Sequence, residues 1–239
     1  MNRQRPRHPA SARAAREKSA PDPAKNRTRK RASAKLPGQE AKASRVTARR
    51  ETILAAALDE FSVGGFAATR LDDVAKRAGV AKGTIYLYFR DKETLFQELV
   101  RSMLSPVVGA AESMPKSDLP IRDVAERLIT HFVRDIFNTR RKDVIRLVIA
   151  EGPRFPKLAE FYYREVLSRV MAVMRGLIEQ GIARGEIKNR SLAKFPQLLV
   201  APGLVSIVWS GLFDRFAPID IEAMMRTHLD LLFGERKVS

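Results

Sequence analysis

From Arg49 onward, apolar residues recur in one stretch after another at the spacing of an α-helix. Ile53, Leu54, Ala57, Leu58 and Phe61, for example, fall at positions i, i+1, i+4, i+5 and i+8, which form one helix face. No stretch shows the sustained alternation of a half-buried β-strand. The chain is therefore predicted to be all-α, with about nine helices.

Positive charge is concentrated before this helical part. Residues 1–50 hold 16 lysines and arginines against 3 acidic residues, and so carry +13 of the +17 of the whole chain. Five prolines and a lack of aromatic residues predict a segment that buries too little apolar surface to offset its ordering entropy. We expect residues 1–46 to be a disordered basic tail. It either solubilises the protein or lies along DNA phosphates without sequence preference, whereas its prolines disfavour a transit peptide.

Several functions lack support in the sequence. There is no cysteine, which excludes disulfides and cysteine-based zinc sites or nucleophiles. His131 and His228 do not have metal-ligand spacing, and no phosphate loop or hydrolase motif is present. The longest apolar run, 198–209, is interrupted and is shorter than the ~20 residues of a membrane span. We expect a cytoplasmic protein that is not an enzyme and has no cofactor, no metal and no membrane association.

Two short predicted helices, 71–78 and 82–88, carry the clearest functional pattern. Gly79-Val80-Ala81 joins them, and two helices joined by such a short turn with a glycine form a helix-turn-helix. In this motif the second helix enters the major groove of DNA and the first crosses the backbone. Thr69 and Asp72 stand where a capping box would begin the first of these helices.

The second of these helices and its flanks hold side chains that suit DNA. Lysines and hydroxyl groups bind phosphates and base edges, and a glycine lets the backbone approach closely. Taken singly, Tyr86 could belong to the core, the lysines could be solvated, and Thr69 could act only as a cap. The predicted DNA-contacting residues are Thr69, Lys82, Gly83, Thr84, Tyr86, Tyr88 and Lys92.

At these residues the sequence resembles the TetR/AcrR family of bacterial transcriptional regulators. The resemblance covers about 55 residues. It includes the helix at 53–61 with the Gly64-Gly65-Phe66 that follows, and the elements Gly83-Thr84-Ile85-Tyr86-x-Tyr88-Phe89 and Lys92-Glu93-x-Leu95. It implies phosphate contacts at Thr69, Tyr88 and Lys92 and base or close backbone contacts at 82–84. Ala81 departs from the family, where a polar residue is common, so one phosphate contact is expected to be missing.

The family resemblance also implies a two-domain homodimer. A break rich in proline and small residues at 105–120 separates the two parts. We expect the tail at 1–46, a three-helix DNA-binding domain at 47–107, a linker at 108–120, and a helical ligand-binding and dimerisation domain at 121–236.

The ligand site is less clearly indicated. The stretch 145–162 resembles one C-terminal subgroup of the family, and aromatic side chains could line a cavity between helices. Such residues at helical spacing are more often plain core. Glu151 either faces a cationic ligand or pairs with an arginine such as Arg154. The candidate ligand-binding residues are Phe132, Phe137, Glu151, Phe155, Phe161, Tyr162 and Trp209.

The apolar segments Leu192–Phe213 and Ile221–Phe233 are the candidate dimer interface, because two helices from each subunit can form a two-fold bundle. Their alternative role is the internal core of a monomer. Together these features predict a DNA-binding transcriptional regulator, a repressor that a small-molecule effector releases from a palindromic operator in double-stranded DNA. The alternative is an architectural DNA-binding protein of weak sequence selectivity, driven by the basic tail.

Overall fold

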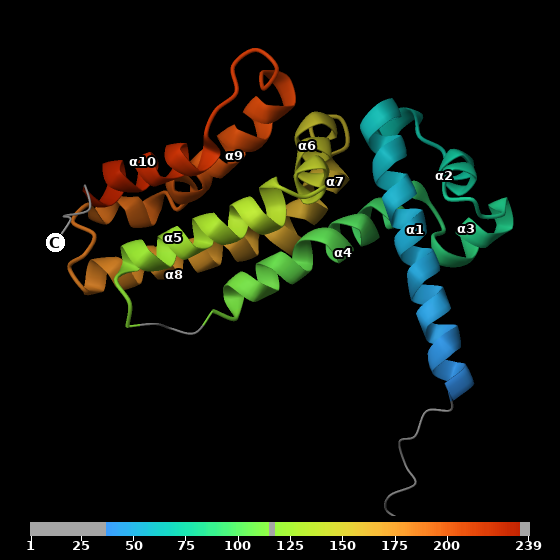
Figure 1. Ribbon diagram of the computed structural model, residues 1–239, viewed down its shortest axis with the longest axis horizontal. Helices are drawn as coiled ribbons and strands as arrows, with labels where there is room; N and C mark the ends of the chain where they lie inside the picture. Colours follow the sequence, from blue (N-terminus) through green and yellow to red (C-terminus); the bar gives the residue numbers. More distant parts are fainter. Residues whose placement is uncertain (1–36, 115–117, 235–239) are drawn as a thin grey trace, which may run out of the picture. The chain divides into compact units, whose positions relative to one another are not determined.

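The computed structural model describes residues 37–114 and 118–234 (Figure 1). The prediction of an all-α chain is confirmed, since the described residues form helices and no strand. The chain divides into two units, residues 1–46 and 47–239. No helix among the described residues is long and apolar enough to cross a membrane.

Helix α1 runs from Pro37 to Ala68. It begins within the segment that we expected to be disordered, so the tail prediction is wrong for 37–46; residues 1–36 lie outside the described part. Alanine, lysine and arginine in 41–50 favour a helix, and adding residues to an existing helix avoids the cost of nucleation. The helix is broken at Gly65, which leaves the helical region with φ 74° and ψ 165°.

The helix-turn-helix is present as predicted. Helix α2 (Leu71–Arg77) and helix α3 (Lys82–Tyr88) follow α1, and Gly79 between them has a φ of 65°, which suits a glycine. Helix α4 (Lys92–Glu112) begins at an Asp91 cap, whose carboxylate accepts a hydrogen bond from the Thr94 N–H at 2.7 Å. The α4 helix continues past Pro106, so the linker begins after Glu112 rather than at residue 108.

The capping box predicted for α2 is wrong. Arg70 is the N-cap residue, and no side chain caps the helix. The Thr69 hydroxyl instead donates back into α1, to the carbonyl oxygens of Gly65 at 2.8 Å and Glu60 at 3.2 Å. Thr69 is buried because it closes the end of α1 after the break at Gly65.

The C-terminal part consists of further helices. Two of its segments are π-helical, a form that is rare and often found at functional sites. The elements are α5 (Ile121–Phe132), a π segment at Val133–Phe137, α6 (Arg141–Glu151), α7 (Pro156–Tyr162), a π segment at Tyr163–Leu167, α8 (Ser168–Ala183), a 3₁₀ turn at Arg190–Lys194, α9 (Gln197–Leu212) and α10 (Ile221–Phe233).

Two hydrophobic cores hold the chain together. The first joins α1–α4 to α6 and α7, since Phe66 and Phe96 of the DNA-binding part belong to the same buried cluster as Leu147 and Phe161. The second lies among α5, α8 and α10, around Ile178. Burial of each such side chain contributes about 1.5–3 kcal/mol, so the first core binds α6 and α7 firmly to the predicted DNA-binding domain.

Pro202 lies within α9 and has no N–H to donate to the carbonyl of Leu198, one turn earlier. The Nε2 atom of His228, on α10, lies 2.7 Å from this carbonyl oxygen. The imidazole therefore carries its proton on Nε2 and donates to Leu198 in place of the missing backbone group. His228 thus links α10 to α9.

We expect His228→Leu to lower the free energy of unfolding by about 1 kcal/mol, the typical net contribution of one hydrogen bond. Pro202→Ala restores a backbone N–H for Leu198, so the loss is expected to be smaller in that background. Urea denaturation of the four proteins in this double-mutant cycle measures the coupling. An equal loss in both backgrounds would show that His228 acts through packing alone.

Candidate functional site

Helix α3 separates its residues into a buried and an exposed side. Ile85 and Phe89 are fully buried against the first core. Lys82, Gly83 and Tyr86 are exposed, and Tyr86 is a surface residue with 48% of its area exposed. Because its buried side is packed in the core, α3 holds the exposed Lys82, Gly83 and Tyr86 in a fixed position at the surface.

A carboxylate on α2 holds two of the predicted DNA-contacting side chains. The ammonium of Lys82 lies 2.7 Å from Asp72 Oδ2, and the Tyr86 hydroxyl donates to Oδ1 at 3.4 Å. The Lys82 hydrogen bond lowers the pKa of Asp72, and the Asp72 hydrogen bond raises the pKa of Lys82, so both groups are charged at neutral pH. A DNA phosphate that binds Lys82 must compete with Asp72. The sequence pattern indicates only a capping-box role for Asp72.

Three other predicted phosphate contacts lie closer to the protein interior. The Lys92 ammonium donates to the carbonyls of Phe66 at 2.9 Å and Ala67 at 2.8 Å, and lies 4.8 Å from the Phe66 ring centre. Thr69 is bonded to α1, as described above, and Tyr88 is half-buried. The polar groups of Lys92 and Thr69 therefore donate hydrogen bonds to backbone carbonyls at the end of α1. Contact of either side chain with a phosphate stays a prediction.

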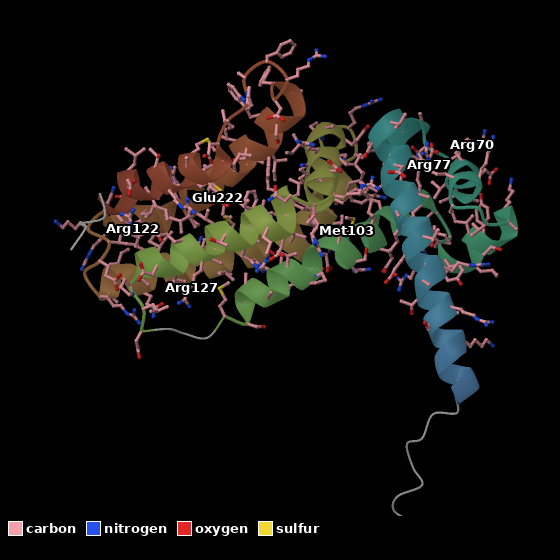
Figure 2. All side chains as sticks on the ribbon, viewed as in Figure 1. Arg70, Arg77, Met103, Arg122, Arg127 and Glu222 are labelled. Atoms are coloured by element: carbon pink, nitrogen blue, oxygen red, sulfur yellow. The ribbon has the colours of Figure 1, made fainter. Side chains whose placement is uncertain are left out.

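Thr84, at the start of α3, is half-buried. Further cations surround the helix pair: Arg70 and Lys76 are exposed, and Figure 2 labels Arg70 and Arg77 beside α2. Arg77 is paired with Glu60 at 2.6 Å. Arg70 and Lys76 are thus exposed cations in addition to the residues predicted from the motif.

Glu151 connects α6 to the break in α1. Its Oε1 atom accepts a hydrogen bond from the Phe66 N–H at 3.1 Å, and the side chain is buried. Its Oε2 atom is also buried and has no hydrogen-bond partner among the described residues. Phe155 adds an edge-on ring contact to Phe66, with centroids 4.9 Å apart. Glu151 does not form the predicted pair with Arg154, because its carboxylate instead accepts a hydrogen bond from the backbone N–H that the break leaves free. Contact of Glu151 with a cationic ligand stays a prediction.

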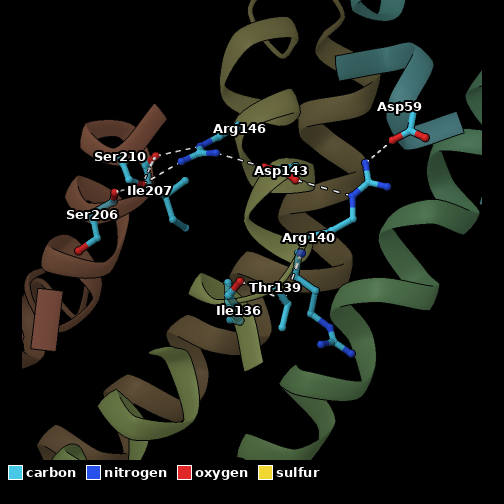
Figure 3. Close-up of polar contacts among 10 residues, drawn as sticks. Asp59, Ile136, Thr139, Arg140, Asp143, Arg146, Ser206, Ile207 and Ser210 are labelled. Carbon is cyan, nitrogen blue, oxygen red and sulfur yellow. Dashed lines mark hydrogen bonds and ion pairs between the residues drawn. The ribbon is translucent and has the colours of Figure 1, made fainter. Parts of the chain in front are cut away.

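A second connection runs from α1 along α6 to α9 (Figure 3). Arg140 pairs with Asp59 of α1 at 2.5 Å and with Asp143 at 3.9 Å, and Asp143 pairs with Arg146 at 3.1 Å. Arg146 also donates to the Ile207 carbonyl at 3.0 Å and to Ser210 Oγ at 2.9 Å. Partly exposed pairs of this kind contribute little stability, but they fix the position of α6 relative to both α1 and α9.

A cavity of about 250 Å³ lies among α4, α5, α8, α9 and α10. Its lining is almost entirely apolar. Of the candidate ligand-binding residues, Phe132 and Tyr162 line it. Burial raises the pKa of Tyr162 to about 12, so this side chain is a neutral phenol.

The other five candidates do not line this cavity. Phe155 and Glu151 face the end of α1, and Phe161 belongs to the first core. Phe137 lies beneath the Lys142 ammonium, and Trp209 donates to the Ala217 carbonyl at 2.6 Å. Sequence spacing identified the four aromatic residues among them as apolar helix positions, but it could not tell which helix each one faces.

The predicted dimer segments expose large apolar side chains. On and beside α9 and α10 these are Phe195, Leu198, Leu204, Val205, Leu212, Phe213, Phe216 and Leu231. Contiguous exposed apolar surface is typical of an interaction site. Within the described residues, no cluster of three or more His, Asp or Glu side chains could hold a metal ion.

Comparison with known proteins identifies both halves. A family model described as bacterial regulatory proteins, tetR family, matches residues 53–99, and a model described as tetracyclin repressor-like, C-terminal domain, matches residues 121–227. The HTH-type transcriptional regulator RutR of Escherichia coli (strain K12) is 27% identical over 191 residues, which cover 75% of this chain and 79% of RutR. The uncharacterized HTH-type transcriptional regulator YhgD of Bacillus subtilis (strain 168) is 29% identical over 140 residues, 59% of this chain and 72% of YhgD.

Solved structures share the fold. The transcriptional regulator FadR from Bacillus subtilis, solved in complex with stearoyl-CoA, matches with a TM-score of 0.60 and 23% identity, covering 78% of this chain and 99% of FadR. The two family models together match more than half of the chain, and they fall on the helix-turn-helix and on the helices that enclose the cavity. The chain therefore belongs to the TetR family of bacterial transcriptional regulators.

Proposed function

We propose that this DNA-binding regulator is a repressor, and that a small molecule bound in the C-terminal cavity releases it from a palindromic operator. The observation that carries the DNA-binding part is α3, whose buried back and exposed Lys82, Gly83 and Tyr86 suit insertion into a major groove. The protein acts in the cytoplasm, where it meets the bacterial chromosome.

The operator is palindromic because two copies of the chain bind it together. The exposed apolar side chains of α9 and α10 supply a surface that a second copy can cover with two-fold symmetry. The two α3 helices then enter major grooves about 34 Å apart, one turn of DNA. Equilibrium sedimentation of the purified protein measures this association directly.

Release is proposed to act through α6. Ile145 on this helix and Ile207 on α9 line the cavity. Glu151 at the end of α6 and Arg140, which directly precedes this helix, contact α1. A ligand that fits the cavity only when α6 is displaced shifts the population away from the DNA-binding conformation. FadR from Bacillus subtilis, which has this fold, was solved in complex with stearoyl-CoA, and this supports the binding of a small molecule here.

The test is a binding measurement on the DNA immediately upstream of the protein's own coding region. It uses random competitor DNA, 50 and 200 mM salt, the full chain, and a chain without residues 1–36. We expect both proteins to select this DNA. The shortened chain should lose affinity uniformly and show a smaller dependence on salt, because the basic tail contributes only counterion release.

Two outcomes separate the alternatives. The first is that the shortened chain loses DNA binding and the full chain shows no sequence preference in a genome-wide selection. The protein is then an architectural DNA-binding protein rather than a repressor, an alternative that the +13 charge of residues 1–50 favours. If selection recovers a palindrome elsewhere in the genome, the regulator stands and autoregulation is excluded.

A further inference from the structure

Two histidines line the apolar cavity, and their hydrogen bonding differs. His228 is already occupied, because its Nε2 donates to the Leu198 carbonyl. The Nε2 atom of His131 is buried and has no hydrogen-bond partner among the described residues. A buried polar atom without a partner costs about 1–3 kcal/mol. Because the His131 side chain also lines the cavity, a bound molecule is a candidate partner for it.

Asp135 fixes which proton His131 carries. The Nδ1 atom of His131 lies 2.6 Å from Asp135 Oδ2. Two lone pairs would repel at this distance, so Nδ1 bears the proton and donates to the carboxylate. Arg134 Nη2 lies 3.2 Å from the same Nδ1, but Arg134 already donates to both oxygens of Asp135.

The Arg134 hydrogen bond holds the pKa of Asp135 below its usual range, so the partner of His131 stays a carboxylate at neutral pH. In an imidazole whose single proton lies on Nδ1, Nε2 is a hydrogen-bond acceptor, and a ligand bound to this form presents a donor to it.

The helix that carries this pair changes form beside the cavity. The π segment Val133–Phe137 begins two residues after His131 and contains both Asp135 and the lining residue Ile136. The second π segment, Tyr163–Leu167, lines the cavity with Val166 and Leu167. Such π segments are frequent at functional sites, and here both of those described border the cavity.

The cavity lining is poor in polar side chains. Among its lining residues, the polar side chains are His131, His228 and Tyr162, and no lysine, arginine, aspartate or glutamate is present. An anionic or cationic head group would lose its hydration without a counter-charge, which costs several kcal/mol. A volume of about 250 Å³ also lies below the range usual for drug-sized ligands.

We infer that the cavity binds a small, neutral, largely apolar molecule with one hydroxyl group, which donates a hydrogen bond to Nε2 of His131. The Asp135–His131 pair recognises the hydroxyl group through a hydrogen bond, and the apolar lining of the cavity contacts the rest of the molecule. This inference deepens the ligand part of the proposed function by naming the chemical class of the effector.

Calorimetry on the full chain without DNA tests this with three probes on one skeleton: 4-tert-butylphenol, its methyl ether and 4-tert-butylbenzoate. We expect the phenol to bind about tenfold more tightly than the ether, since the ether leaves Nε2 unpaired, and the benzoate to bind most weakly. His131→Phe should abolish the difference between phenol and ether. His131→Gln, which keeps an acceptor, should restore part of it.

Thr130→Val is the matched control. Thr130 is the exposed neighbour on the same helix, and its hydroxyl bonds only to the Glu126 carbonyl at 3.2 Å. This variant should keep the full preference for the phenol. Thermal melting of each variant shows whether the fold is intact.

Equal affinities for phenol and ether in the unaltered protein, a preference for the benzoate, or no binding of any probe would overturn the inference. None of these results bears on operator recognition, which is measured separately on DNA. Conversely, if the protein binds the phenol through His131 but selects no DNA sequence, the repressor proposal is wrong and the inferred chemical class of the ligand is still supported.

Discussion

Gly65→Ala is expected to destabilise the protein by about 2–6 kcal/mol. The backbone at φ 74° and ψ 165° lies in a region that is essentially restricted to glycine, and another residue there costs about 1–3 kcal/mol. A Cβ atom would also lie 2.6 Å from Glu151 Oε1. The carboxylate must then move, which leaves the buried N–H of Phe66 without its acceptor and adds about 1–3 kcal/mol.

Gly64→Ala is the matched control for this change. Gly64 is helical, and a Cβ atom there would meet only the Thr69 hydroxyl, at an ordinary 3.8 Å. We expect this variant to be neutral or up to ~1 kcal/mol more stable, because alanine favours a helix over glycine. Urea denaturation compares the two. Equal stability of both variants would show that the break at Gly65 and its contact with Glu151 are not needed for the fold.

Gly83→Leu is expected to weaken operator binding about 100-fold or more while leaving the fold intact. Nothing lies within 4 Å of a Cβ built at Gly83, so the free protein accommodates a larger side chain without strain. A helix inserted in the major groove does not, since leucine at this position would hold its backbone away from the base edges. Loss of two good base contacts costs about 3 kcal/mol, whereas non-specific binding through phosphates should persist.

Gly176→Leu supplies the control for this prediction. Gly176 lies on the exposed side of α8, and a Cβ there also meets open space. Both leucine variants should match or slightly exceed the parent in stability, and only Gly83→Leu should lose the operator in fluorescence anisotropy titrations. Unchanged operator affinity of Gly83→Leu would exclude α3 from the groove.

The fold followed from the sequence where local signals are strong. Helical spacing and the glycine turn at residue 79 predicted the helix-turn-helix, because short-range periodicity and backbone conformation determine both. The start of α1 and the end of α4 were misplaced. The helix-forming residues before Arg49 show no apolar periodicity that would reveal the start of α1. Pro106 suggests the end of a helix, although the apolar face of α4 continues beyond it.

The site was harder to predict, because its decisive contacts join residues far apart in sequence. Glu151 meets Phe66 across 85 positions, and no periodicity or spacing reveals such a pair. Motif matching found Lys82 and Tyr86, but not the Asp72 carboxylate that holds both. The spacing of His131 bears only on metal binding, because its unpaired Nε2 and its place in the cavity lining depend on the folded structure.

The shared core of α1–α4 with α6 and α7 sets a rule for building chimeric regulators. A hybrid that joins this DNA-binding part to a foreign sensor after Glu112 would strip Phe66 of its contacts with both Glu151 and Phe155. It would also expose the apolar surface that Leu147 and Phe161 cover. Such a hybrid should fold and respond to its ligand only if the incoming sensor domain brings an equivalent of α6 and α7. The linker after Glu112 is therefore not a boundary at which the two parts of this protein can be exchanged independently.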